Sequence, residues 1–107
     1  SSQVLRVNGK LEVSNAVSLP ITTVTSNTTL GANHYTVLVN AASLTITLPA
    51  ASTCSGRIYI IKNIIASTTT IDGNASETID GNPTVTLTSN WEKKVIQSNG
   101  TNWFIIN

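Results

Sequence analysis

The sequence is broken into short runs of residues that favour β-strands, and no stretch favours a long helix. Apolar residues nowhere recur with the 3.6-residue period of an amphipathic helix over three turns. Short runs rich in β-branched residues instead alternate with Gly, Pro, Asn and Asp, which end strands and form turns. We therefore predict eleven strands, over residues 4–7, 10–13, 21–25, 35–40, 44–48, 57–64, 68–71, 77–79, 84–88, 92–97 and 102–106.

The composition agrees with an all-β fold. Val, Ile and Thr make up 38 of the 107 residues, and these stiff, branched side chains pack well on pleated strands. So many strands in a chain of this length leave a sandwich, a small barrel or a β-rich fibre as architectures. We predict an antiparallel β-sandwich of the jelly-roll kind, preceded by a short hairpin or shaft segment.

Residues 1–30 and 31–107 differ in composition, and we divide the chain there. The first part has few large side chains, and its Asn8-Gly9 pair is typical of a hairpin turn between residues 4–7 and 10–13. The second part contains most of the isoleucines and all five aromatic residues, so we expect it to form the sandwich. An isolated hairpin is marginally stable in water. The first part is therefore a floppy leader, a hairpin that packs on its own domain, or a segment that meets copies of itself around an axis.

Charge and hydropathy exclude two classes of partner. Six Lys and Arg against five Asp and Glu give a net charge of +1, which leaves no basic surplus for binding nucleic acid. The longest apolar runs have four residues, such as residues 58–61, whereas a membrane-spanning helix needs about 20. The sequence contains no methionine, and we expect it to be a processed product or a piece of a longer protein.

No set of residues points to catalysis. The single histidine, His34, and the single cysteine, Cys54, match no nucleophile motif, and no G-x-S-x-G occurs. Two of the five carboxylates, Asp72 and Asp80, precede glycines and are typical of turns. The sequence shows no cluster of His, Cys and carboxylate side chains with metal-ligand spacing. We therefore expect a protein that is not an enzyme and uses no cofactor or metal.

Two aromatic residues begin predicted strands beside polar loops and are candidates for ligand binding. Tyr35 follows Asn33 and His34, and Trp91 follows Asn90. An aromatic ring at such a place can stack on a sugar ring while neighbouring polar side chains hydrogen-bond to the hydroxyl groups. Our candidate binding residues are therefore Asn33, His34, Tyr35, Asn90 and Trp91. The alternative is that each aromatic residue covers an edge of the core.

Five segments of the second part carry a resemblance to a known family. They are residues 37–40 (VLVN), 45–52 (TITLPAAS), 56–63 (GRIYIIKN), 76–81 (SETIDG) and 98–103 (SNGTNW). Over residues 31–107 this pattern resembles the carboxy-terminal domains of phage tail-fibre and head-fibre proteins, and similar domains occur in giant-virus and bacterial trimeric fibre proteins. Residues 5–13 look like the shaft or neck segment that precedes such domains.

The resemblance implies a homotrimeric fibre whose tip is a β-sandwich that binds a cell-surface receptor, commonly a glycan. It places the protein on a virion or on an extracellular or cell-surface fibre. Two alternatives remain from the sequence: a monomeric carbohydrate-binding module of a secreted enzyme, and a purely structural fibre or capsid domain without a ligand.

Overall fold

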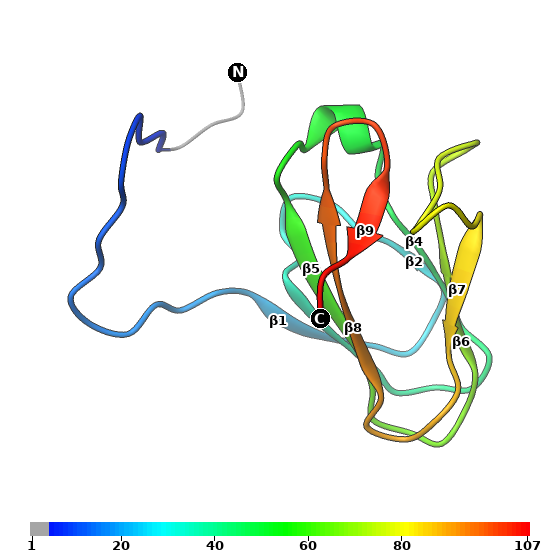
Figure 1. Cartoon of the computed structure of the whole chain (residues 1–107). Helices are drawn as coiled ribbons and strands as arrows, with labels where there is room; N and C mark the ends of the chain where they lie inside the picture. Colours follow the sequence, from blue (N-terminus) through cyan, green and yellow to red (C-terminus); the bar gives the residue numbers. More distant parts are fainter. Residues whose placement is uncertain (1–4) are drawn as a thin grey trace.

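The computed structural model describes residues 5–107, which form two packed β-sheets and an extended arm (Figure 1). We call the larger sheet sheet A. Its five strands are, in spatial order, β1 (Ile21–Val24), β3 (Thr36–Val39), β5 (Ile58–Asn63), β8 (Lys93–Ser98) and β9 (Trp103–Ile105). Sheet B contains β2 (Thr28–Thr29), β4 (Thr45–Thr47), β6 (Thr69–Asp72) and β7 (Thr84–Leu87). The only helix in the described chain is one turn of 3-10 helix, η1 (Ala51–Thr53).

The chain crosses from one sheet to the other after each of the first five strands. Strands β1, β3 and β5 therefore lie side by side in sheet A and run parallel, and β2, β4 and β6 do the same in sheet B. The result is a coil of three turns, each of which adds one strand to each sheet. The last three strands reverse direction, with β7 antiparallel to β6, β8 antiparallel to β5, and β9 antiparallel to β8.

The predicted all-β sandwich is confirmed, but its strand directions are mixed. Four of the seven strand pairs are parallel, so the expected antiparallel jelly-roll arrangement holds only for β7, β8 and β9. Inward and outward side chains alternate along a strand whichever way its neighbour runs. The sequence pattern therefore located the strands without indicating their directions.

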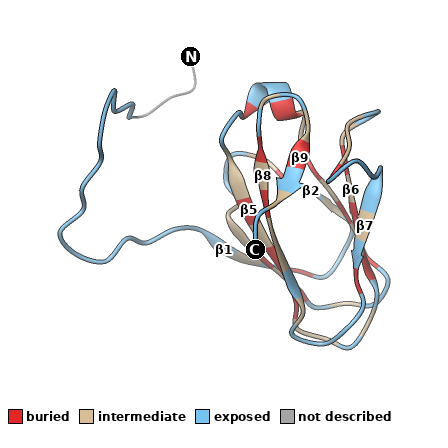
Figure 2. Ribbon diagram, in the orientation of Figure 1, coloured by how far each residue is buried: buried red, intermediate tan, exposed pale blue. Residues whose placement is uncertain are grey.

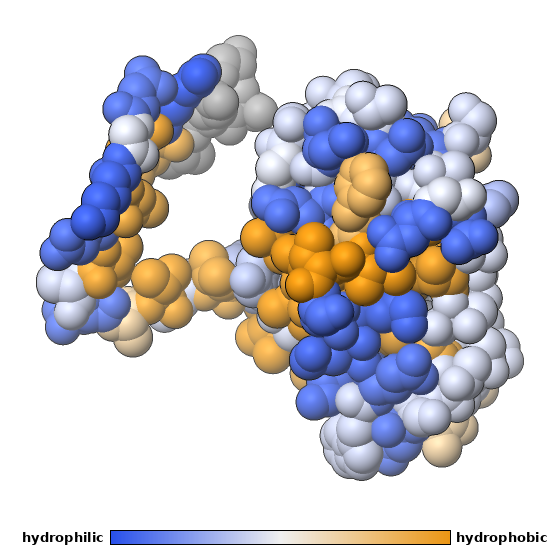
Figure 3. All heavy atoms as spheres, viewed as in Figure 1, coloured by the Kyte–Doolittle hydropathy of each residue, from blue (hydrophilic) through white to orange (hydrophobic). Residues whose placement is uncertain are grey.

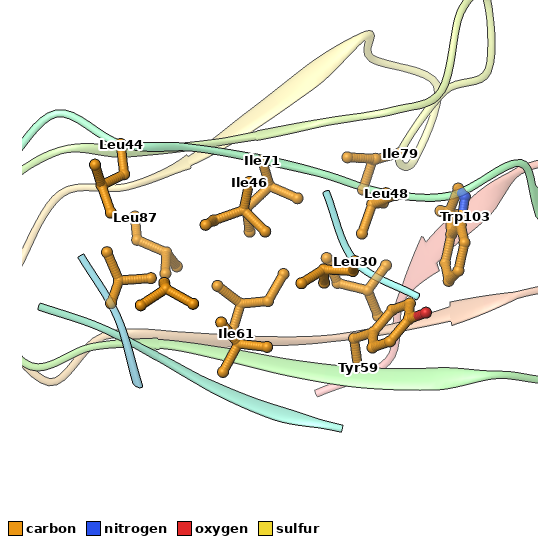
Figure 4. Close-up of a cluster of buried hydrophobic side chains, with 14 of the residues drawn as sticks. Leu30, Leu44, Ile46, Leu48, Tyr59, Ile61, Ile71, Ile79, Leu87 and Trp103 are labelled. Atoms are coloured by element: carbon orange, nitrogen blue, oxygen red, sulfur yellow. The ribbon is translucent and has the colours of Figure 1, made fainter. Parts of the chain in front are cut away.

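Inward-facing side chains from both sheets bury one another and form the core. Burial alternates along the strands, most clearly in β5 and β3 (Figure 2). The rings of Tyr59 and Trp103 lie 5.7 Å apart between centroids at one side of the core (Figure 4). The fully buried aliphatic side chains are Val37, Val39, Ile46, Leu48, Ile61, Ile71, Ile79, Leu87 and Ile96.

The sandwich begins ten residues earlier than the predicted boundary at residue 31. β1 pairs with β3 and β2 pairs with β4, so residues 21–29 are the first turn of the coil and belong to the domain. The short strand β2 was not predicted, because Thr28 and Thr29 lack the bulky apolar residues that mark a strand. The predicted strand at 77–79 is absent, and only Ile79 makes isolated bridges, to Asn82 and Trp103.

Residues 5–20 form an extended arm that leaves the domain at β1 (Figure 1). Every one of these residues is exposed, and none of residues 5–19 makes a backbone hydrogen bond to another described residue. Residues 5–13 therefore do not form the hairpin predicted around Asn8-Gly9. The first residue of that predicted hairpin, Val4, lies outside the described residues. A lone hairpin gains too little buried surface to close in water.

Gly73→Ala should destabilise the domain, because an added Cβ would lie 2.6 Å from the carbonyl oxygen of Glu77. The backbone of this turn has to shift, and we expect the free energy of unfolding to fall by about 1–3 kcal/mol. Gly31→Ala is the matched control, since a Cβ there meets no atom within 4 Å. Urea denaturation of the two variants measures the difference, and equal stabilities would contradict the close approach.

Candidate functional site

The loops of the sandwich gather at its two ends (Figure 1). We call one end the Trp91 end, where strands β1, β3 and β5 finish; its loops are residues 25–27, 40–44, 64–68 and 88–92. The opposite end is the His34 end, where the arm joins β1; its loops are residues 30–35, 48–57, 73–83 and 99–102. This division follows from the strand directions.

The five predicted binding residues are not brought together. Asn33, His34 and Tyr35 lie at the His34 end, where the Tyr35 carbonyl accepts a hydrogen bond from the Ile60 N–H. Asn90 and Trp91 lie at the other end, where the Trp91 N–H donates to the Asn63 carbonyl. The sequence contained no information on which loops share an end, because that depends on the strand directions.

At the His34 end the candidate residues are engaged in the loop itself. The Gly31 N–H donates to His34 Nδ1 at 3.0 Å, and the His34 N–H donates to the Gly31 carbonyl at 3.2 Å. The same carbonyl accepts the Tyr59 hydroxyl at 2.9 Å, and burial raises the pKa of Tyr59, which keeps this donor protonated. His34 and Tyr35 are half-buried and only Asn33 is exposed, so this group offers little free aromatic surface.

Trp91 is the most exposed aromatic residue of the described chain. Its residue is 63% exposed, and its backbone has φ 69°, in the left-handed region that bulky residues rarely adopt. The ammonium group of Lys62 lies 5.9 Å from the centre of the indole ring, a cation–π geometry. A large apolar ring held in solvent in a strained conformation is a common mark of a functional position.

The loop that displays Trp91 is held by hydrogen bonds from two side chains. Glu92 Oε1 accepts the N–H groups of Thr88 at 2.7 Å and Ser89 at 3.1 Å. The fully buried Asn63 donates through Nδ2 to the carbonyls of Ser67 and Ser89, and its Oδ1 accepts the Thr69 hydroxyl at 2.6 Å. Hydrogen bonds therefore hold loop 88–92 internally, through Glu92, and link it to loop 64–68, through Asn63.

The rest of the Trp91 end is built from short polar side chains. The Ser43 N–H donates to Ser67 Oγ at 3.0 Å, and the Thr45 N–H donates to Asn27 Oδ1 at 2.8 Å, so successive loops are linked. Asn90 is exposed next to Trp91. Such a surface can stack the apolar face of a ring and hydrogen-bond to hydroxyl groups around it.

Neither a cluster of metal-ligating side chains nor a pocket is present among the described residues. No group of three or more His, Cys, Asp and Glu residues gathers among residues 5–107, and no pocket opens on this part of the molecule. Cys54 is a free, buried thiol at the end of η1. No helix in the described chain has the length and hydropathy needed to cross a membrane.

Sequence reasoning named Trp91 and Asn90 as candidates but did not identify the residues that position them. Lys62, Asn63 and Glu92 were assigned only to strands, because their roles depend on contacts between loops far apart in the sequence. The one available signal was Glu92 itself, a carboxylate directly after an aromatic loop residue.

The sequence matches no family model and no curated protein, and no solved structure matches the fold.

Acidification should loosen the Trp91 loop. Hydrogen bonds from the Thr88 and Ser89 N–H groups, together with the charge of Lys94, lower the pKa of Glu92 from its ordinary value of 4.5. Because the folded pKa is lowered, the stabilising effect is complete above pH 4.5 and is lost as the pH falls through the folded value.

The Thr88 and Ser89 amide signals in NMR spectra measure this effect, and we expect their titration midpoint to lie below 4.5. Glu92→Gln should abolish that titration and speed hydrogen exchange at both amides at neutral pH. Glu77→Gln is the control, because the Glu77 carboxylate accepts the Ala51 N–H at the other end of the sandwich. A midpoint at or above 4.5 in the unmodified protein would show that the carboxylate does not hold the loop.

Proposed function

We propose that this chain is the attachment domain of a trimeric viral or bacterial fibre and that it binds a cell-surface glycan without catalysis. The observation that carries the proposal is the exposed Trp91 ring on a hydrogen-bonded loop. An aromatic ring that is already fixed loses little conformational entropy when a ligand stacks on it. The setting is the surface of a virion or of a cell.

The position of Trp91 supports a role at the tip of a fibre. The arm joins β1 at the His34 end, so the Trp91 loop lies at the end of the sandwich opposite that junction. A domain carried on its arm then presents Trp91 away from the point of attachment. Loops that are held by a rigid sandwich can vary in sequence without disturbing the core, which suits receptor recognition.

The chemistry around Trp91 suits a sugar ring. The flat indole offers the apolar surface on which a sugar ring stacks, and Lys62 approaches the same ring. Asn90 and the neighbouring serine and threonine groups supply donors and acceptors for hydroxyl groups. Three copies in one fibre would combine weak single sites into firm attachment through effective concentration.

Two other functions fit parts of the molecule. A carbohydrate-binding module of a secreted enzyme would use the same Trp91 platform but would work as a monomer. A purely structural fibre or capsid domain would need no ligand, and the exposed apolar surface of the arm favours it as the second candidate. Binding measurements and oligomeric state separate the three functions.

Trp91→Ala should weaken glycan binding and cell attachment while the fold is kept. Truncating an aromatic residue at the centre of a binding site commonly costs more than about 1 kcal/mol, roughly fivefold or more in affinity. Trp91→Phe retains a ring and should retain most of the binding. Glycan-array and cell-attachment measurements compare the two variants.

Tyr35→Ala provides the matched test at the other end of the sandwich. We expect no loss of binding from this variant, since Tyr35 is half-buried and remote from Trp91. Loss with Tyr35→Ala but not with Trp91→Ala would move the site to the His34 end. Binding that survives both substitutions would place the glycan site at neither end residue and contradict the Trp91 assignment. Absence of glycan binding by the unmodified protein would favour the purely structural function.

A further inference from the structure

The two sheets present very different outer surfaces. The outer face of sheet B is made almost entirely of threonine: Thr29, Thr45, Thr47, Thr70, Thr84 and Thr86, with Asp72 among them. The outer face of sheet A is dominated by apolar side chains. We call this surface the apolar face; its members are Ile21, Leu38, Ile58, Ile60, Val95, Phe104 and Ile106.

Strand register places several apolar side chains in one row, which Thr36 alone interrupts. Ile21 pairs with Thr36, Thr36 with Ile60, and Ile60 with Val95. The Ile106 N–H donates to the Val95 carbonyl and extends this row past β9. Figure 3 shows the result as an apolar band over β5, β8 and β9.

Lysines limit the apolar face on the side of the Trp91 end. In the row next to the apolar one, Leu38 pairs with Lys62 and Lys62 pairs with Lys93. The apolar face therefore stops before the Trp91 loop and leaves the candidate binding end outside it.

The comparison with sheet B indicates that the apolar residues are not needed to form the strands. Threonine has nearly the shape of valine and an equally high preference for strands. Sheet B uses it on the face that meets water, whereas sheet A carries Ile, Leu, Val or Phe at most of its outward positions and threonine only at Thr23 and Thr36. Exposed apolar patches of this kind, bordered by polar residues, mark interaction surfaces.

The arm carries a second apolar row. From residue 5 to residue 21 the odd positions hold Leu5, Val7, Gly9, Leu11, Val13, Asn15, Val17, Leu19 and Ile21, and the even positions hold Arg6, Asn8, Lys10, Glu12, Ser14, Ala16, Ser18 and Pro20. Side chains on an extended chain alternate between two sides, so all the large apolar residues fall on one side. Figure 3 shows apolar atoms along one side of the arm and hydrophilic atoms along the other.

Ile21 joins the two surfaces. It is the last member of the odd row and the first residue of the outer row of sheet A, and it is 67% exposed. The row of the arm thus runs directly into the apolar face. One elongated apolar surface extends from the arm across the whole sheet.

We propose that further copies of this chain cover this surface, with apolar faces and odd rows packed together in a cyclic assembly. This assignment rests on the oligomer in the proposed function but not on glycan binding. A second copy has the same apolar row on its arm and the same apolar face on sheet A. The apolar surfaces of two copies therefore match in length and width.

Area and charge support a copy as the partner. Nine large apolar residues of the surface are at least 41% exposed: Leu5, Val7, Leu11, Val13, Val17, Leu19, Ile21, Phe104 and Ile106. At roughly 100 Å² each, they account for about 800–900 Å² per chain, the area that one partner buries in a standard stable interface. The odd row and the apolar face contain no charged side chain, so identical copies meet there without repulsion between like charges.

The mass of the 107-residue chain in solution is the first test. Analytical ultracentrifugation should give a multiple of 11.3 kDa at micromolar concentration. The double variant Ile60→Thr with Val95→Thr makes sheet A resemble sheet B and should raise the dissociation constant at least tenfold. Thr70→Val with Thr86→Val on sheet B is the matched control and should leave the mass unchanged. Circular dichroism and thermal unfolding check that both variants keep the fold.

Cross-linking identifies the partner and tests the arm. In a Cys54→Ser background, Val13→Cys places a thiol in the odd row and Ser14→Cys places one on the opposite side. A short bis-maleimide reagent should join copies through position 13 and much less through position 14. Equal cross-linking at both positions would contradict an interface formed by the odd row.

The outcomes separate this assignment from the proposed function. An oligomer that is insensitive to Ile60→Thr with Val95→Thr overturns the assignment while leaving the fibre proposal standing. A monomer at micromolar concentration overturns both the assignment and the trimer, and binding of that monomer to phosphatidylcholine vesicles would assign the surface to lipid. A dimer supports the interface and contradicts the trimer, and an oligomer that binds no glycan supports the interface and contradicts the receptor-binding function.

Discussion

The fold depends on two sheets burying each other's inward side chains. Among residues 5–107 no long helix or third layer covers either sheet, so the aliphatic rows of β3 and β5 face those of β4 and β6 across one core (Figure 4). Close packing of this kind tolerates little change in volume. Because each strand contributes one side to this core, each needs alternating inward and outward side chains. A strand as short as β2 is stable because it pairs with β4.

Much of this fold could be predicted from the sequence, but the pairing could not. Alternating apolar residues located eight of the nine strands, because inward positions must be apolar whichever way the neighbour runs. The predicted hairpin would have separated the apolar residues of the arm. A two-residue turn at Asn8-Gly9 pairs odd positions with even ones, as Val7 with Lys10, so the odd-numbered apolar residues would lie on two different faces. An extended chain keeps them on one side.

The candidate site was predictable only in part, for the same reason. Trp91 and Asn90 could be recognised because they interrupt a run of strands with a bulky ring and a turn residue. Their separation from Tyr35 follows from strand direction, which the sequence does not indicate. The role of Asn63 was also hidden, since its amide joins loops at Ser67 and Ser89 that are 22 residues apart in the chain.

The coiled path of the chain has a consequence for how such a domain can change in length. Thr36 lies 15 residues after its partner Ile21, and Ile60 lies 24 residues after Thr36, so the turns of the coil differ in length while their strands stay in register. Duplicating or deleting one turn would lengthen or shorten both sheets together and would leave the antiparallel strands at the other edge untouched. The free edge of β1 is where such a turn would be added, and Pro20, which has no N–H to donate, stands directly before it. The number of strands in the two sheets can thus change by one turn of the coil at a time, while β7, β8 and β9 stay the same.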